Sequence, residues 1–210
     1  DNSPITYVSW YAAKDYCDEL FQISILHQKD IVSKCIDIAS KSNLAGVMTF
    51  SASPEALMAV SLACYKLKLP CISRKSIKKT SNKYIMKKCF NYNEVETSEW
   101  ILTKQVDEAL SFFNKYGTVI IKPYLNSRGS EGIRLCKTKN SLLNYFSVEN
   151  NKSQDSKVIV EKYNEGQEYS VDGIVIGDSP VVLSISKKYN LGEKYNFIMK
   201  GFSTEFPYKK

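Results

Sequence analysis

The hydrophobic pattern changes partway along the chain, and this change limits the fold more than any other feature. In the first third, short apolar runs alternate with segments whose apolar residues recur at helical spacing. From about residue 118 onward, short extended runs are separated by turn residues instead. The first pattern predicts an α/β unit, and the second predicts antiparallel strands with a few helices. We therefore expect the chain to hold parts of more than one domain.

The N-terminal part is predicted to form a partial parallel sheet. The runs 20–25 and 44–50 are short and apolar, as is typical of buried strands. Helices are predicted between and after them, over 31–39 and 53–68, so strands and helices alternate. A doubly wound domain needs more strands than this. We therefore expect 1–74 to be a partial domain that begins inside a larger one.

The rest of the chain is predicted to form three further segments. The segment 75–117 is expected to be a linker helix and the start of the next domain. It should hold a basic helix over 76–90, an extended stretch over 95–102 and a helix over 105–116 that ends at Gly117. Two antiparallel segments follow, 118–165 and 166–210. Their strands are expected at 118–122, 132–136, 157–161, 169–176 and 181–185, with a helix over 139–148.

Composition excludes several classes of protein. Of the 210 residues, 43% are apolar, yet no run reaches the roughly 18 that a membrane span needs. The start of the chain is polar and shows no secretory signal. Six cysteines without a Cys-x-x-Cys pair, and the single histidine His27, give neither zinc-site spacing nor a histidine-based catalytic triad. We interpret the cysteines as reduced core residues and expect a cytoplasmic protein without a membrane partner.

The net charge of +7 leaves a nucleic-acid partner open as a minor alternative. The densest basic cluster is 74–79, which Lys83, Lys87 and Lys88 extend. Runs of this kind usually form the solvated face of a helix, and no zinc finger or aromatic-basic pattern accompanies this one.

A lysine followed by a loop of small residues suggests a phosphate site. Lys122 ends an apolar strand, and the loop 126–132 comes directly after it. Glycines in such a loop let backbone N–H groups approach phosphate oxygens, and a lysine adds a compact positive charge. The order of lysine and glycines differs from that of a Walker loop or a protein kinase. The candidate loop residues are Ser127, Arg128, Gly129, Ser130 and Gly132.

A second motif suggests an adenosine site. The strand that contains Glu161, Lys162 and Tyr163 runs into a connecting segment, where backbone groups can bind the edge of an adenine ring. Glu168 follows shortly after, and a carboxylate at such a place can accept hydrogen bonds from ribose hydroxyls. Taken alone, Glu168 is equally well an exposed glutamate on a strand.

Together, in this order, the motifs resemble the ATP-grasp superfamily. The resemblance assigns Lys83 and Lys122 to the nucleotide phosphates and the loop at 127–133 to closure over the triphosphate. It assigns the backbone of Glu161 and Tyr163 to adenine, and Glu168 to ribose. It implies that 1–74 resembles the end of a Rossmann-like pre-ATP-grasp domain, 118–165 the small lid subdomain and 166–210 the start of the C-terminal subdomain. The sequence around 167–173 has a form common among carboxylate-amine ligases.

The resemblance also implies a reaction. An ATP-grasp ligase activates a carboxylate as an acylphosphate, which an amine or similar nucleophile then attacks. ATP, Mg²⁺ and a small carboxylate are the implied cofactors and partners, but no catalytic side chain or metal ligand can be identified. The acidic and asparagine metal ligands of the family are expected outside this chain, which alone should then be inactive. A non-catalytic nucleotide-binding homologue is the main alternative, and the substrate and a homodimeric state stay open.

Overall fold

The chain folds as two units that divide within a helix. The computed structural model describes residues 16–49, 51, 53–125, 132–152, 155–193 and 197–204. Contacts group the residues into the units Asp1–Met86 and Lys87–Lys210.

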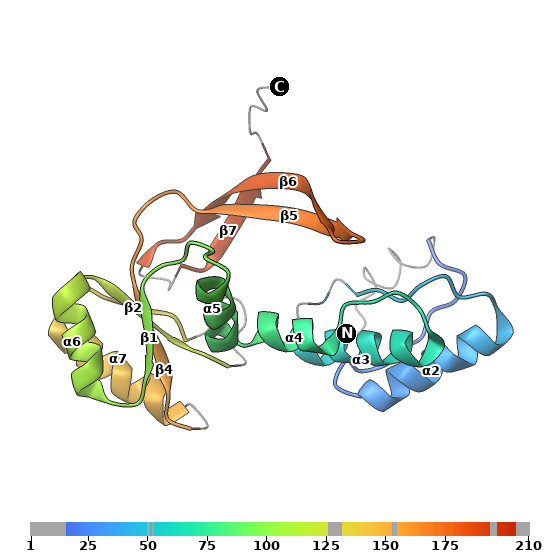
Figure 1. Cartoon of the computed structure of the whole chain (residues 1–210), viewed down its shortest axis with the longest axis horizontal. Coiled ribbons are helices and arrows are strands. Elements are labelled where there is room, and N and C mark those ends of the chain that lie inside the picture. The colour runs from blue at the N-terminus through green and yellow to red at the C-terminus, as the bar shows by residue number, and fades with distance from the viewer. Residues whose placement is uncertain are drawn as a thin grey trace. The chain divides into compact units, whose positions relative to one another are not determined.

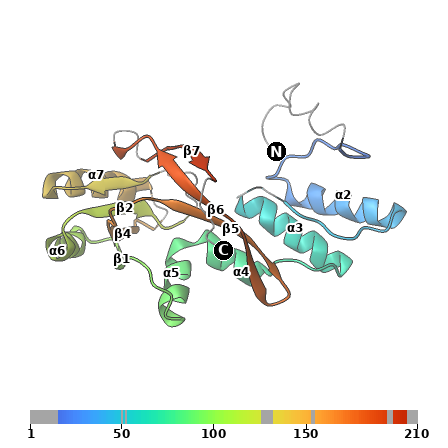
Figure 2. The ribbon, with the colours of Figure 1, turned by 90° about the horizontal axis from the view of Figure 1, so that it is seen from above.

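The N-terminal unit is helical in its described part. Helix α2 (Gln28–Lys41) packs on α3 (Pro54–Leu67), and the two lie side by side (Figures 1 and 2). Small residues make up much of the buried face of α3, which lets α2 approach closely. Helix α3 begins with Pro54 at a first-turn position, where a missing N–H costs nothing. The small buried residues of α3 are Ala56, Ala59, Ser61, Ala63 and Cys64.

The predicted parallel sheet is absent from the described residues, and that prediction is wrong for this part of the chain. Of the two predicted strands, neither 20–25 nor 44–49 has a ladder partner there. An apolar run becomes a strand only when a neighbouring strand satisfies its backbone groups. The second run instead contacts a helix, because the Cys64 thiol donates to the carbonyl oxygen of Val47 at 3.7 Å.

The predicted basic helix over 76–90 is two helices. Helix α4 (Arg74–Ser81) ends where Asn82 adopts an extended backbone, with φ −110° and ψ 108°, and α5 (Lys83–Tyr92) follows. The Asn82 side-chain oxygen accepts a hydrogen bond from the Ile85 amide at 3.0 Å. Asn82 therefore caps α5, a role that suits asparagine because its short side chain reaches the unpaired first-turn N–H groups.

A four-stranded antiparallel sheet forms the first layer of the C-terminal unit. Its strand order is β1-β4-β2-β3, so β1 and β3 are edge strands. Helices α6 and α7 pack against the sheet (Figure 1). The segment predicted as a linker thus contributes a strand and a helix to this layer. The elements are β1 (Trp100–Thr103), α6 (Val106–Tyr116), β2 (Val119–Pro123), β3 (Arg134–Cys136), α7 (Lys139–Lys152) and β4 (Val158–Lys162).

The core of this layer lies between the helices and one face of the sheet. Alternate residues of β2 and β4 point into it, as the period of two in a strand requires. The intervening residues point to the opposite face of the sheet, where the candidate site lies. The core residues are Ala109, Phe112, Val119, Ile121, Cys136, Leu142, Phe146, Val158 and Val160.

A second antiparallel sheet completes the unit. It contains β5 (Tyr169–Ile176), β6 (Ser179–Asn190) and β7 (Met199–Ser203) in that order. The turn between β5 and β6 uses Gly177, whose φ of 62° suits glycine. Two of these strands match the sequence prediction, which is therefore confirmed for an antiparallel C-terminal part, whereas β7 was not predicted.

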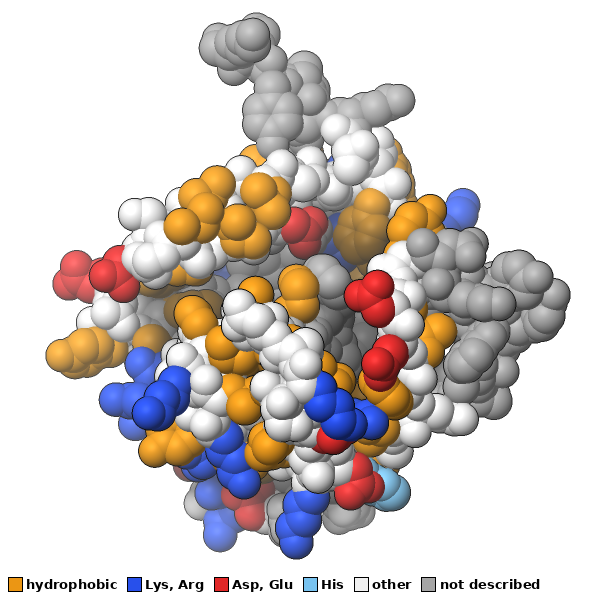
Figure 3. All heavy atoms as spheres, turned by 90° about the vertical axis from the view of Figure 1, so that its right-hand side faces the viewer, with side chains coloured by type: hydrophobic (Ala, Val, Ile, Leu, Met, Phe, Trp, Pro, Cys, Tyr) orange, Lys and Arg blue, Asp and Glu red, His pale blue; other side chains and the backbone are white. Residues whose placement is uncertain are grey.

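Apolar side chains are exposed in both units. None of the described helices is long and apolar enough to cross a bilayer. Figure 3 shows one face of the molecule, on which hydrophobic side chains lie among charged ones. Exposed apolar residues of that unit include Met48 and Tyr65, and those of β5 and β6 include Val175 and Leu183.

Candidate functional site

Lys122 and Glu161 form an ion pair on the face of the first sheet that faces away from α6 and α7. Strand register pairs Ile120 with Glu161, so Lys122, two residues further along β2, lies diagonally across from Glu161. A lysine side chain is long enough to span this diagonal. Its ammonium group contacts Oε2 of Glu161, and both side chains are mostly buried. The two strands that the sequence assigned to phosphate and to adenine are therefore neighbours.

A second lysine, Lys87 on α5, contacts the same carboxylate. Its Nζ lies 3.0 Å from Oε1 of Glu161, and the side chain is only 3% exposed. The ammonium group also donates to the Thr97 hydroxyl at 2.8 Å and to the Ser98 carbonyl oxygen at 3.4 Å. Burial lowers the pKa of Lys87, and its contact with Glu161 opposes that shift. Sequence reasoning noted Lys87 only as part of a basic run.

The two oxygens of Glu161 are held differently. Oε1 contacts Lys87, whose other partners fix its position. Oε2 contacts Lys122 as an ion pair but accepts no hydrogen bond of regular geometry within the described residues. The carboxylate thus carries one charge between two ammonium groups, and the Lys122 contact is the less constrained of the two.

A cavity of about 420 Å³ lies beside the start of β2 and the end of β4, which are paired, and its size suits a small-molecule ligand. The connection from β4 to β5 forms one wall, and residues of the second sheet form another. The rings of Tyr163 and Phe197 approach to 6.1 Å between centroids. The lining combines apolar side chains with a few polar ones, namely Ile120, Ile133, Tyr163, Asn164, Glu165, Gly166, Gln167, Glu168, Lys188, Asn190, Phe197 and Met199.

Glu168 lines this cavity, where the sequence predicts ribose binding. Its side chain is half exposed and ion-paired with Lys188 of β6, which also lines the cavity. The Lys188 amide donates to the Glu168 carbonyl oxygen at 2.8 Å. The Gln167 side chain donates to the Lys188 carbonyl oxygen at the same distance. Backbone hydrogen bonds therefore fix the position of the Glu168 main chain, while its carboxylate can exchange Lys188 for another partner.

The predicted adenine-binding backbone is partly engaged within the sheet. The Lys162 amide donates to the Glu99 carbonyl oxygen at 2.9 Å, and the Tyr163 amide donates to the Thr118 carbonyl oxygen at 3.1 Å. Carbonyl oxygens can accept a second hydrogen bond, whereas each amide has a single proton. Contacts of Glu161 and Tyr163 with adenine stay a prediction. The backbone carbonyl groups of these two residues are the acceptors that suit this role.

The other predicted phosphate residues are only partly described. Ser127, Arg128, Gly129 and Ser130 lie outside the described residues. Gly132 is described and has a φ of 71°, a backbone conformation that favours glycine. Lys83 is the first residue of α5, one helical turn before Lys87, and belongs to the N-terminal unit.

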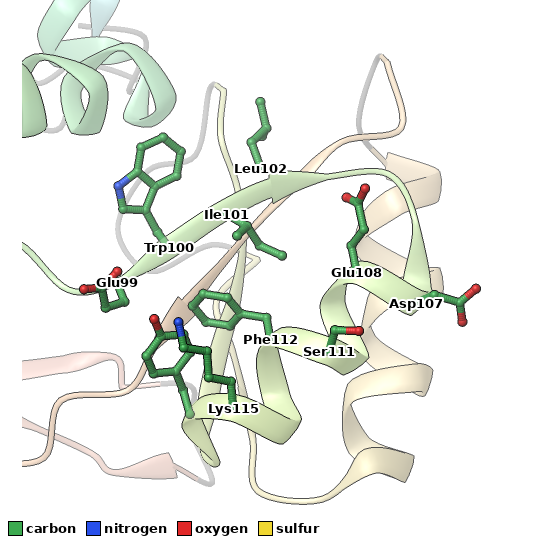
Figure 4. Close-up of a pocket in the computed structure, with 10 residues that line it drawn as sticks. Glu99, Trp100, Ile101, Leu102, Asp107, Glu108, Ser111, Phe112 and Lys115 are labelled. Atoms are coloured by element: carbon green, nitrogen blue, oxygen red, sulfur yellow. The ribbon is translucent and has the colours of Figure 1, made fainter.

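A larger groove of about 740 Å³ lies elsewhere, between β1 and α6 (Figure 4). Phe112 and Lys115 reach into it from α6, and Glu99 lies at the end near β1. None of the residues that the sequence assigned to the nucleotide lines this groove. It therefore offers an internal comparison for the smaller cavity.

Acidic side chains that could hold a metal ion by themselves do not cluster in the described residues. No group of three or more His, Cys, Asp or Glu side chains gathers in the part of the chain that the structure describes. Mg²⁺ prefers carboxylate oxygens and water. Glu161 on the neighbouring sheet face and Glu168 in the cavity wall are each paired with lysine, and Glu165 also lines the cavity.

A family model described as ATP-grasp domain matches residues 80–210. No curated protein sequence matches the chain. The match covers all of the second unit, including Lys87, Lys122, Glu161 and Glu168.

Several solved structures share the fold. N5-carboxyaminoimidazole synthetase from Staphylococcus aureus, complexed with ADP, matches 91% of this chain and 47% of its own at a TM-score of 0.65 and 15% identity. Phosphoribosylglycinamide synthetase from Anaerococcus prevotii matches 87% of this chain and 44% of its own, at a TM-score of 0.64 and 18% identity. The biotin carboxylase domain of Hydrogenobacter thermophilus 2-oxoglutarate carboxylase was solved in complex with MgADP, ADP and bicarbonate. It matches 81% of this chain and 40% of its own, at a TM-score of 0.64 and 19% identity. This chain spans less than half the length of each.

Proposed function

Because the chain belongs to the ATP-grasp family, we propose that it carries the nucleotide site of an ATP-dependent ligase. The proposed reaction activates a small carboxylate as an acylphosphate for attack by an amine or similar nucleophile. The observation that carries this proposal is the Lys122–Glu161 pair, which shares a sheet face with Ile120, a residue that lines the same cavity as Glu168.

The cavity suits the adenosine part of the nucleotide. Apolar side chains such as Ile133 and Met199 can cover the faces of a base, while carbonyl groups at the end of β4 can accept from its amino group. Glu168 can accept hydrogen bonds from the ribose hydroxyls once it exchanges Lys188 for them. These contacts recognise parts of the nucleotide that do not react.

Lys122 suits the phosphate part. In the proposed first step, a carboxylate oxygen of the substrate bonds to the γ-phosphorus, and the bond from that phosphorus to the bridging oxygen of ADP breaks. In the second step, the amine bonds to the acyl carbon and expels inorganic phosphate. Charge on the phosphate oxygens is spread during transfer, so a positioned ammonium group lowers the barrier.

Magnesium would add further neutralisation of the phosphates when bound. Its ligands are proposed to lie outside the described residues. We therefore expect this chain alone to bind nucleotide weakly and to turn over little or no substrate.

A calorimetric titration with a non-hydrolysable ATP analogue and Mg²⁺ tests the site. Lys122→Ala should weaken binding by about tenfold or more, because it removes a charged contact to phosphate. The matched control is Lys115→Ala, which removes a lysine from the other groove and should leave binding unchanged. Loss of binding in the control alone, or no binding by the folded unmodified chain, would contradict the proposal.

ADP release from the full-length protein separates an enzyme from a nucleotide-binding homologue without activity. ADP release that depends on an added carboxylate supports the ligase. Tight nucleotide binding without carboxylate-dependent ADP release supports the non-catalytic alternative.

A further inference from the structure

We propose that Lys87 is a positioning residue of this nucleotide site: it serves as the permanent counter-ion of Glu161, so that Lys122 can leave Glu161 for a phosphate oxygen. The inference rests on the proposed function, because it concerns the same site. It adds a residue on α5 that does not itself touch the nucleotide.

The first argument is how firmly Lys87 is held. It is almost fully buried, and its three ammonium protons have three partners at hydrogen-bond distance, Glu161, the Thr97 hydroxyl and the Ser98 carbonyl oxygen. A buried ammonium group whose three protons all have acceptors would lose these hydrogen bonds by moving. Lys87 therefore fits a fixed counter-ion and not a group that travels to a ligand.

The second argument is that the Lys122 ammonium group is more exposed and has fewer partners than that of Lys87. Lys122 is several times more exposed than Lys87, at 18% against 3%. Within the described residues, its ammonium group contacts Oε2 of Glu161 and no other polar partner. It lies at the end of β2, beside the cavity wall that Ile120 contributes. A phosphate group in that place could take over the ammonium group without disturbing either strand.

The third argument concerns the buried carboxylate of Glu161 after Lys122 has moved to a phosphate. When Lys122 turns to a phosphate, Glu161 stays mostly buried, and a second cation beside it offsets the cost of a buried carboxylate. Lys87 is that cation. Without it, Lys122 would be the sole counter-ion of Glu161, and binding a phosphate would require breaking this pair.

The chain also connects Lys87 to the cavity wall. Ser98, whose carbonyl oxygen Lys87 contacts, accepts a hydrogen bond on its hydroxyl from the Asn164 side chain at 2.7 Å. Asn164 lines the cavity. A variant of Lys87 could therefore disturb the adenosine end through Ser98, and the experiment must distinguish that effect from the one on Lys122.

The experiment compares two ligands, adenosine and a non-hydrolysable ATP analogue with Mg²⁺, by calorimetry on the whole chain. Lys87→Met should weaken the ATP analogue by about tenfold, because Lys122 is retained by Glu161. Adenosine has no phosphate, so its affinity should stay within about twofold. Lys87→Arg keeps the charge and should bind both ligands nearly as the unmodified chain does.

The double variant Lys87→Met/Glu161→Gln provides the rescue. Removing both charges leaves Lys122 without a competing carboxylate, so the affinity for the ATP analogue should return to within about threefold of the original. A residue with a purely structural role would show no such recovery. Circular dichroism checks that each variant is folded, and if Lys87→Met alone does not fold, the double variant and Lys87→Arg still test the proposal.

The outcomes separate this inference from the proposed function. If Lys87→Met weakens both ligands equally, or if the double variant binds the ATP analogue as poorly as the single one, the positioning role is overturned. If Lys122→Ala abolishes binding while Lys87→Met leaves it unchanged, only the inference on Lys87 falls. If the folded unmodified chain binds neither ligand, the proposed function falls and this inference with it.

Discussion

At the scale of single residues, the half-exposed pair of Glu168 and Lys188 leads to a first prediction. Glu168→Ala should weaken adenosine and ATP analogue alike, by about fivefold to tenfold, because both ligands carry the ribose that it is proposed to bind. Stability should change by less than about 1 kcal/mol, since exposed ion pairs contribute little. Glu193→Ala, which removes another exposed glutamate paired with a lysine, serves as the control in the same titrations. An effect confined to the ATP analogue would contradict the assignment to ribose.

The cysteines give a second prediction at this scale. None of the six, all of which are described, forms a disulfide: Cys64 and Cys136 are buried, whereas Cys17 and Cys71 are exposed. The sequence interpretation of reduced core residues therefore holds for two of them. Burial raises the pKa of the Cys136 thiol to about 12. At pH 8, about one such thiol in ten thousand is then ionised, and only the thiolate reacts with alkylating agents.

Mass spectrometry after brief treatment with iodoacetamide at pH 8 measures this directly. Cys17 and Cys71 should be modified first, and Cys136 should react only when urea unfolds the chain. Rapid modification of Cys136 in the folded protein would show that the α7 side of the first sheet is not packed as described.

Sequence singled out residues only where their place in the backbone is distinctive. Lys122 lies near the end of β2 and Glu168 directly precedes β5, and the order of the motifs drew attention to both, while their roles stay predictions. Lys87 has no distinctive position of this kind, because the sequence of a basic run does not show which of its lysines is buried. Its burial depends on Thr97, Ser98 and Glu161, which only the fold brings to it.

At the scale of elements, the break between α4 and α5 leads to a third prediction. Asn82→Ala removes the oxygen that accepts from the Ile85 amide and should cost about 1 kcal/mol of unfolding free energy. Asn82→Asp keeps an acceptor at the helix start and should cost much less. Urea denaturation followed by circular dichroism compares the two. Equal losses would mean that the cap does not stabilise α5.

Helix α7 provides the fourth prediction through two neighbouring leucines. Leu142 is fully buried in the core of the first sheet, whereas Leu143 is 41% exposed. Leu142→Ala should lower the unfolding free energy by about 2–5 kcal/mol, because it leaves a cavity among packed side chains. Leu143→Ala should change it by less than about 1 kcal/mol. Similar losses for both would contradict the packing of α7.

Element type followed local pattern where turns and periodicity agreed. The extended runs at 169–176 and 181–185 were sufficient to predict two strands of an antiparallel segment, which the structure has as β5 and β6. The apolar runs at 20–25 and 44–50 were misread, because a run alone does not reveal whether a partner strand exists. Strand β7 was missed because Met199–Ser203 contains no β-branched hydrophobic residue and includes a glycine.

At the scale of the whole molecule, the described site residues other than Lys83 lie within one unit. The cavity takes its walls from two antiparallel sheets of that unit and from the connection between β4 and β5. Sequence order predicted which segments take part. Sequence order could not predict that β1 joins the first sheet or that α6 packs against it. Strand pairing between distant segments depends on packing and not on local preference.

The central claim is that adenine nucleotide binds in the cavity at the end of β4 and not in the larger groove between β1 and α6. Amide chemical-shift mapping by NMR, with an ATP analogue and Mg²⁺ added stepwise, tests it most directly. We predict saturable shifts at Tyr163, Glu168 and Met199, with none of comparable size at Ile101 or Ser111 of the groove. Shifts centred on β1 and α6, or none in either place at millimolar nucleotide, would contradict the account.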